Sequence, residues 1–304
     1  VDEIIELEMY SVEEEIRFQT FLTVIKLATG LVEYKGLFRS EMITNAIEYV
    51  ITEEENEMER LRNLEALEDF LVDLQSISTF DKKANFVFFE KIVTALRDVF
   101  QQHKEQVCGD DIYIASLRCL SEILKILDPN ESSMVWLNIS ALVINPLNNH
   151  SDVNEDIIAE LIGCFAEVIE VHPSFAATLF KNPAEISTIT KYILNAQSLE
   201  NEDALRNSVF FVGVLSLGSE NSLMVDSMSG VLRLIQWINE IYCTTDVEAI
   251  KDNCVAACLK LYYNPVFTAS LSGIMTNAQI SAFILQRIPL KGDEGETPIY
   301  LQAI

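Results

Sequence analysis

The sequence predicts an all-α protein in which paired helices form a superhelical array. Apolar residues recur at three- and four-residue spacing, for example at Leu117, Leu120, Leu124 and Leu127, which is the pattern of an amphipathic helix. The 304 residues include only 10 glycines and 7 prolines, and these fall at breaks between the periodic segments. No convincing run alternates with a period of two, so we expect no sheet.

The helices recur at a regular interval along the chain. Glu167 follows Glu122 by 45 residues, and Asn253 follows Asn207 by 46, at matched positions of successive helices. A two-helix period of about 45 residues is the length of a HEAT-type repeat. Because one helix pair cannot bury its apolar face alone, neighbouring pairs stack. The sequence therefore predicts a HEAT-repeat superhelical solenoid of about six helix pairs, with a compact irregular helical domain as the alternative.

Capping signals mark where the expected helices begin and end. Ser11 with Glu14 forms a capping-box pattern, and Asp128 precedes a first-turn proline. His172-Pro173 and Asn182-Pro183 repeat this signal, and Asn264-Pro265 closes a helix. The expected helices are 11–30, 40–54, 56–77, 81–105, 110–127, 129–147, 154–171, 173–195, 201–217, 221–242, 246–263 and 276–287.

We expect residues 1–304 to form a single array, less regular over 1–105 and regular over 106–304. The chain does not begin with methionine, so we expect it to be part of a longer protein. Its first residues also lack the basic region of a secretory signal.

The charge balance indicates the kind of partner. The chain has 47 Asp and Glu against 21 Lys and Arg, a net charge of −26, yet 49% of its residues are hydrophobic. Acidic disordered tails lack that apolar content, so the charge belongs to a folded body. Such a body repels nucleic acid and anionic lipid and attracts basic protein segments. No stretch reaches the ~18 to 20 apolar residues of a membrane helix, and we therefore expect a protein partner, with no nucleic acid and no membrane.

No metal, cofactor or catalytic chemistry is predicted. Cys254 and Cys258 are four residues apart, but His103, His150 and His172 lie far from them in sequence. We expect the six cysteines to be reduced core thiols. The chain has no phosphate-binding glycine loop, dinucleotide-binding fingerprint, zinc-protease motif or nucleophile elbow, so we predict that it is not an enzyme.

Two segments near the C-terminus resemble a known family. Residues 250–261 contain Lys251-Asp252-Asn253 followed by small and apolar residues, and residues 288–296 contain Pro289-Leu290-Lys291 followed by acidic residues. Together, in this order and at this separation, they resemble the C-terminal part of importin-beta-type nuclear transport receptors of the importin four and importin five branch. Ile288 replaces the leucine usual there, and Gly295 interrupts the acidic pair.

The resemblance covers about residues 245–301 and implies a function. It implies the C-terminal part of a receptor that binds basic nuclear localisation signals of histones or ribosomal proteins and shuttles between cytoplasm and nucleus. It also implies binding of Ran-GTP and of nucleoporin Phe-Gly repeats, mainly through parts outside this chain. The alternative is a HEAT-repeat scaffold for a folded partner, such as a phosphatase or an assembly complex.

Basic signals are recognised by carboxylates that pair with lysine and arginine, by amides that hold backbone, and by aromatic faces. In the family the second helix of each pair lines the concave side, which implies cargo-binding roles for Trp136, Asn138, Trp237, Asn239 and Glu240. Core packing is the alternative for both tryptophans.

Two further groups complete the predicted cargo site. Asn207 and Asn253 could form an amide ladder for cargo backbone, or could bond the backbone of an adjacent turn and stabilise stacking. Asp293, Glu294 and Glu296 could form a lysine pocket at the end of the groove, or a solvated loop. The acidic run 53–55 is expected at a solvated junction, from which it could steer basic cargo.

Overall fold

The computed structural model describes most of the chain. It covers residues 14–35, 41–52, 56–77, 80–83, 85–148, 153–179, 181–198, 201–217, 231–264, 276, 278–279, 282, 285–286, 290–292 and 294–303. All regular secondary structure within these ranges is helical, as predicted. The chain divides into two compact units, Val1–Pro146 and Leu147–Ile304 (unit 1 and unit 2).

The helices follow the predicted pairs closely. Unit 1 contains α2 (Glu14–Lys35), α3 (Glu41–Thr52), α4 (Glu57–Ser76), α5 (Phe86–Lys104), α6 (Asp110–Ile126) and α7 (Pro129–Val143), and the short α8 (Asn145–Asn148) crosses the boundary. Unit 2 contains α9 (Glu155–Val171), α10 (Phe175–Leu179), α11 (Pro183–Leu194), η1 (Ala196–Ser198), α12 (Glu202–Leu215), α14 (Val231–Thr244), α15 (Glu248–Tyr263), η2 (Glu294–Glu296) and α18 (Thr297–Ala303).

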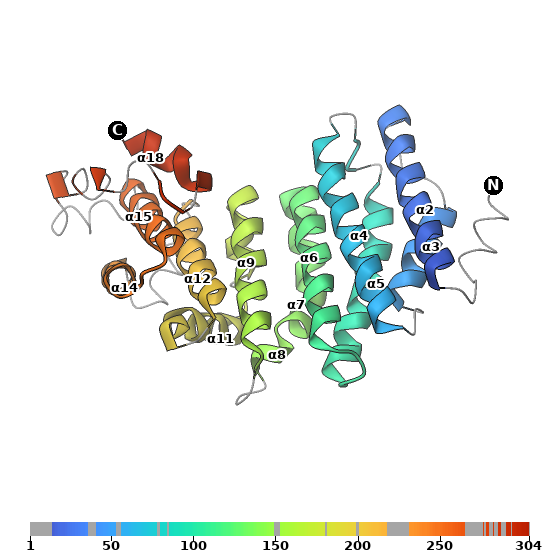
Figure 1. Ribbon diagram of the computed structural model, residues 1–304, viewed down its shortest axis with the longest axis horizontal. Helices are drawn as coiled ribbons and strands as arrows, with labels where there is room; N and C mark the ends of the chain where they lie inside the picture. The colour runs from blue at the N-terminus through green and yellow to red at the C-terminus, as the bar shows by residue number, and fades with distance from the viewer. Residues whose placement is uncertain are drawn as a thin grey trace. The chain divides into compact units, whose positions relative to one another are not determined.

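Unit 1 stacks its helices in two layers. In one layer α2 packs on α4 and α4 packs on α6; in the other α3 packs on α5 and α5 packs on α7. Figure 1 shows α2, α4 and α6 following one another in this order. Large side chains such as Phe70, Phe89, Phe100 and Trp136 fill the space between the layers and are almost fully buried. Stacking of like helices on like helices is what a repeat array requires.

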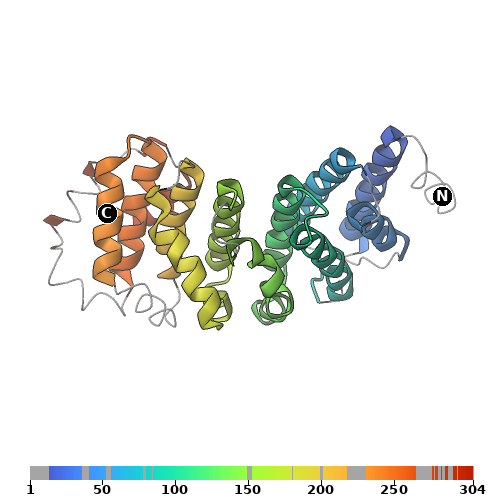
Figure 2. The ribbon, with the colours of Figure 1, turned by 90° about the horizontal axis from the view of Figure 1, so that it is seen from below.

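Unit 2 continues the same kind of stacking. The helices α9, α12 and α15 pack on one another in sequence, while α14 packs on α15 and α18 covers α15 as well. The orange and yellow helices of this unit run side by side in Figure 2. Gly213 permits the close approach of α12 and α15, since a Cβ atom there would lie 3.1 Å from Ala257 Cα.

Helix caps agree with the sequence signals where the structure describes them. The Asp128 backbone N–H donates to Glu131 Oε2 (3.2 Å), which confirms the cap before Pro129. The side chains of Asn56 and Asn154 accept backbone N–H groups at the starts of α4 and α9. Ser11 of the first predicted capping box lies outside the described residues.

One sequence-based expectation differs from the structure. The helix expected over 173–195 is divided into α10 and α11, because Pro183 starts a new helix instead of continuing the first. Among the described helices, none has the length and apolar content needed to cross a membrane.

Candidate functional site

The candidate site is a pocket in unit 2 with a volume of about 320 Å³. Its walls come from the stacked helices α9, α12 and α15 and from the short C-terminal helix η2. Because all four elements belong to one compact unit, its geometry depends only on packing within unit 2.

Carboxylates line one side of the pocket. Glu167 and Glu170 lie three residues apart on α9, so they share one face of this helix, and both are exposed. Among the described lining residues, the one cation is Arg206 on α12, whose Nη2 lies 3.3 Å from Asp203 Oδ1 on the same helix. The mouth of the pocket is therefore negative overall.

Asn207 is a residue of α12 whose side chain reaches α9, and it also lines the pocket. Its Nδ2 donates to the backbone oxygen of Ala159 (2.9 Å), one repeat earlier. Gly163 makes room for this amide, because a Cβ atom at position 163 would lie 2.6 Å from Asn207 Nδ2. This bond links α12 to the preceding helix α9 and does not run to an adjacent turn.

Asn253 occupies the matched position on α15 but is bonded differently. Its side chain is 3% exposed and lines the same pocket. Within the described part of the chain, Asn253 Oδ1 has no hydrogen-bond partner. A buried acceptor without a donor costs about 1–3 kcal/mol, and this oxygen has almost no accessible surface.

The predicted lysine pocket around Glu296 exists, but a lysine of the same chain already fills it. Lys260 Nζ lies 3.0 Å from Glu296 Oε1 and 2.9 Å from Oε2, and 4.9 Å from the centre of the Phe210 ring. The prediction that Glu296 offers its carboxylate to cargo is therefore corrected. Of the other two residues predicted for this lysine pocket, Asp293 lies outside the described residues, and so does the side chain of Glu294.

A buried aspartate holds the segment that carries η2. Asp252 is fully buried, and its Oδ2 accepts the backbone N–H groups of Lys291 (3.0 Å) and Gly292 (2.8 Å). The hydroxyl of Tyr300 donates to the Asp252 backbone oxygen (3.0 Å). These bonds dock residues 290–303 against α15, and Figure 1 shows α18 lying beside that helix.

The other predicted cargo residues do not line this pocket. Trp136 in unit 1 and Trp237 in unit 2 are 1% and 6% exposed, so both rings are packing residues in this conformation and the cargo-contact interpretation is corrected. Asn138 is exposed on α7 of unit 1, and Asn239 and Glu240 are exposed on α14 of unit 2. The acidic run 53–55 lies outside the described residues.

Sequence reasoning missed five lining residues. These are Glu167, Glu170, Arg206, Phe210 and Gly295. The three-residue spacing of the two glutamates, in the repeat before Asn207, was an available signal. No such signal was available for Phe210 and Gly295, because their place in the pocket depends on how α15 and η2 dock against α12.

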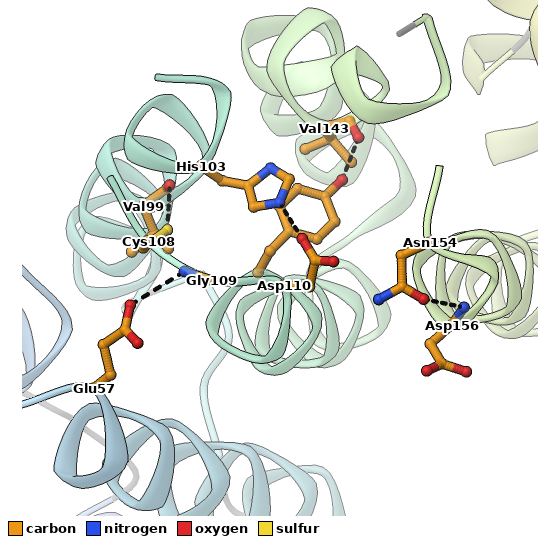
Figure 3. Close-up of polar contacts among 10 residues, drawn as sticks. Glu57, Val99, His103, Cys108, Gly109, Asp110, Val143, Asn154 and Asp156 are labelled. Carbon is orange, nitrogen blue, oxygen red and sulfur yellow. Dashed lines mark hydrogen bonds and ion pairs between the residues drawn. The ribbon is translucent and has the colours of Figure 1, made fainter. Parts of the chain in front are cut away.

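Unit 1 contains a separate group of polar contacts, which Figure 3 shows in close-up. Glu57 Oε1 accepts the backbone N–H of Gly109 (3.2 Å), and His103 Nε2 lies 2.9 Å from Asp110 Oδ1. The Tyr113 hydroxyl donates to the Val143 backbone oxygen. These contacts join successive helices within unit 1, and we assign them a structural role.

Arg60 is the most buried arginine near these contacts. Its Nη1 donates to Gln102 Oε1 (2.8 Å). Burial lowers the pKa of Arg60 from its ordinary value, while the nearby Cys108 and Glu57 oppose that change. The described residues of the whole chain include no group of three or more His, Cys, Asp or Glu that could hold a metal ion.

Comparisons with known proteins establish the fold. No protein-family model and no curated protein matches the chain. Among solved structures, an engineered protein matches with a TM-score of 0.54 at 10% identity, covering 85% of this chain and 95% of that one. A designed armadillo repeat protein matches with a TM-score of 0.53 at 11% identity, covering 86% of this chain and 99% of that one.

A second designed armadillo repeat protein, in complex with the peptide (KR)4, matches with a TM-score of 0.53 at 12% identity. The match covers 87% of this chain and 99% of that one. At these identities the likeness is one of fold. The chain has an all-α helical repeat fold of the armadillo and HEAT type, a fold typical of binding scaffolds.

Proposed function

We propose that this chain binds basic segments of protein partners and is the cargo-binding C-terminal part of an importin-beta-type nuclear transport receptor. The cargo would be a histone tail or a ribosomal protein. In that role the protein shuttles between cytoplasm and nucleus, and Ran-GTP and nucleoporins act mainly through other parts of the receptor.

One observation carries the proposal: an acidic repeat protein forms a pocket from carboxylates and amides. The chain has a net charge of −26, and the pocket brings Glu167 and Glu170 together with Asn207 and Asn253. Carboxylates pair with the cationic side chains of a basic segment, and amides can bond its backbone or its donor groups. Exposed pairs contribute only ~0–1 kcal/mol each, so affinity requires several contacts along the array.

Two further observations support the proposal. A designed protein of the same fold is described in complex with the basic peptide (KR)4, and this supports a basic ligand for the chain. The resemblance of residues 250–261 and 288–296 to importin-beta-type receptors supplies the nuclear role.

The proposal is tested by titrating the chain with a histone H3 tail peptide at low and moderate salt. We expect micromolar or tighter binding that weakens as salt rises, because exposed ion pairs are screened. An acidic peptide of equal length should not bind. Absence of H3 peptide binding at every salt concentration would reject this role for the chain.

Charge reversal tests where the peptide binds. We expect Glu167→Lys with Glu170→Lys to weaken binding strongly, because both positions lie at the mouth of the pocket. The matched control is Glu90→Lys with Asp98→Lys on α5, where two exposed carboxylates of unit 1 are reversed and the net charge changes equally. Equal weakening by both variants would indicate long-range attraction without a defined site.

A further inference from the structure

We propose that the C-terminal segment of unit 2 is a strap whose docking on α15 sets the charge of the pocket. The strap comprises the described residues 290–292 and 294–303. While docked, it keeps the ammonium group of Lys260 paired, and the pocket accepts a basic segment. Once released, it uncovers this ammonium group, which repels such a segment. This inference rests on the proposed function, since it names what regulates binding at the same pocket.

The strap depends on α15 for its order. Its helices η2 and α18 have three and seven residues, whereas an isolated helix needs about 12–15 residues to be even marginally stable in water. The ring of Tyr300 is 2% exposed and packs against Val255, Ala256 and Leu259 of α15, and Figure 1 shows α18 beside this helix. A segment held in this way can open locally while the rest of the unit stays folded.

The contacts that fix the docked position lie outside the pocket. Asp252 Oδ2 accepts the backbone N–H groups of Lys291 (3.0 Å) and Gly292 (2.8 Å). The backbone at Gly292 runs so close to α15 that a Cβ atom there would lie 2.4 Å from Ala249 N. None of these residues belongs to the described lining of the pocket. The strap can therefore be released by a substitution that alters no lining residue.

The ion pair between Lys260 and Glu296 is the part of the docking contact that reaches the pocket. Glu296 is a lining residue on the strap, and the Lys260 ammonium lies 2.9 and 3.0 Å from its two carboxylate oxygens. The same ammonium lies 4.9 Å from the ring centre of Phe210, another lining residue. Removal of the strap therefore uncovers Lys260 beside the pocket, and a buried ion pair whose partners separate in this way acts as a switch.

Release changes the charge of the pocket by one unit. In the docked state Glu296 and Lys260 cancel each other, so the two exposed glutamates of α9 outnumber the one arginine among the described lining residues. Release withdraws the carboxylate with the strap and leaves the ammonium group on α15. One unit charge at ~4 Å in water changes the affinity for a cation by about fivefold. The docked strap is therefore the form that favours a basic segment.

The test uses Gly292→Ala, which displaces the strap from α15 without changing a charge or a lining residue. We expect residues 294–303 to exchange amide hydrogens faster and the histone H3 tail peptide to bind about fivefold more weakly at low salt. The control is Gly109→Ala in unit 1, where the new Cβ lies 3.9 Å from Glu57 Oε1, an ordinary contact, and neither property should change. Unchanged exchange in both Gly292→Ala and Asp252→Ala would show that no releasable strap exists.

A second substitution separates charge from structure. Lys260→Met in the Gly292→Ala chain removes the ammonium group that the released strap uncovers. The charge of the pocket then equals that of the docked state, so we expect the affinity for the H3 peptide to return to within about twofold of the unaltered chain. Continued weak binding by the double variant would show that the strap acts only as a wall, and would overturn the charge switch.

A third measurement needs no variant. Because coupling between two equilibria is reciprocal, a basic peptide that prefers the docked form must also hold the strap closed. We expect saturating H3 peptide to slow the exchange of residues 294–303 about fivefold in the unaltered chain, and an acidic peptide of equal length to leave it unchanged. Unchanged or faster exchange with bound H3 peptide would contradict the coupling.

The two proposals fail in different ways. If the H3 peptide binds the unaltered chain and Gly292→Ala equally well while the variant exchanges faster in 294–303, the switch is wrong and the binding of basic segments stands. If the H3 peptide binds the unaltered chain at no salt concentration, the proposed function is wrong, and the switch is rejected with it.

Discussion

Lys260 and Glu296 form an ion pair across the helix α15 and the C-terminal helix η2, with Nζ–O distances of 2.9 and 3.0 Å. Their side chains are 6% and 8% exposed. Since each would be a buried lone charge without the other, the pair holds η2 in place as one wall of the pocket.

Breaking this pair is expected to destabilise unit 2 strongly. Glu296→Gln leaves Lys260 buried without its counter-charge, which costs about 3–5 kcal/mol of unfolding free energy. The matched control is Asp128→Asn, which removes the partner of the exposed Lys83 (3.7 Å) and should cost about 0–1 kcal/mol in unit 1. Equal losses in the two units would contradict the burial argument.

The two tryptophans allow each unit to be followed separately. Trp136 is buried in unit 1 and Trp237 in unit 2, and the chain contains no other tryptophan. In a Trp136→Phe background, denaturant unfolding followed by tryptophan fluorescence reports on unit 2 alone. We expect Glu296→Gln to shift that transition, and Asp128→Asn to leave it unchanged.

Asp252 and Gly292 are expected to control the docking of residues 290–303. Asp252→Ala removes the acceptor of two backbone N–H groups, and Gly292→Ala places a Cβ atom 2.4 Å from Ala249 N. Both variants should increase hydrogen exchange in 294–303 by about tenfold or more, the effect of losing 1–3 kcal/mol of local stability. Mass spectrometry of C-terminal peptides measures this, and unchanged exchange in both variants would refute the docking role.

Two helical glycines of unit 2 should respond differently to alanine. Each glycine-to-alanine substitution by itself adds about 0.5–1 kcal/mol to the free energy of unfolding, because alanine loses less backbone entropy on folding than glycine. At position 213 the new Cβ meets the α15 backbone at Ala257 Cα (3.1 Å), whereas at position 163 it meets the movable end of Asn207 (2.6 Å). We therefore expect Gly213→Ala to be destabilising by about 1–3 kcal/mol and Gly163→Ala to be nearly neutral. The reverse order in thermal unfolding would contradict this packing.

Thiol chemistry should distinguish buried from exposed cysteines. Burial raises the pKa of Cys258 to about 12 and holds the pKa of Cys119 well above its usual range, while Cys243 is exposed. The thiolate is the reactive form. At pH 8 we expect iodoacetamide to modify Cys243 first, and Cys119 and Cys258 only after unfolding. Mass spectrometry identifies the modified sites, and Cys243→Ser should abolish the rapid phase.

The same burial predicts a dependence of stability on pH. The raised pKa means that the folded chain retains the Cys258 proton where the unfolded chain loses it. The stabilisation is complete below the unfolded pKa, about 8.5, and is lost as pH rises from there towards the folded pKa of about 12. Cys258→Ala should therefore lose stability less steeply between pH 9 and 11. Parallel pH profiles would show that the thiol does not contribute.

The sequence by itself determined the helical class, the paired arrangement and the acidic character. Apolar spacing identifies which side of each helix is buried, and local signals such as Asp128-Pro129 mark helix starts, because both depend on residues close together in the chain. The repeat interval of the sequence also placed Asn207 and Asn253 at matched positions, and the structure brings both residues into one pocket.

Only the tertiary structure decided which polar residues remain available for a partner. The sequence left open whether Glu296 and the two tryptophans contact a partner, but in the structure Lys260 neutralises Glu296 and packing buries both tryptophans. The Lys260–Glu296 pair joins residues 36 positions apart in the sequence. Helical periodicity cannot encode these contacts, because it fixes the orientation of a side chain about its own helix and not the neighbour that it meets.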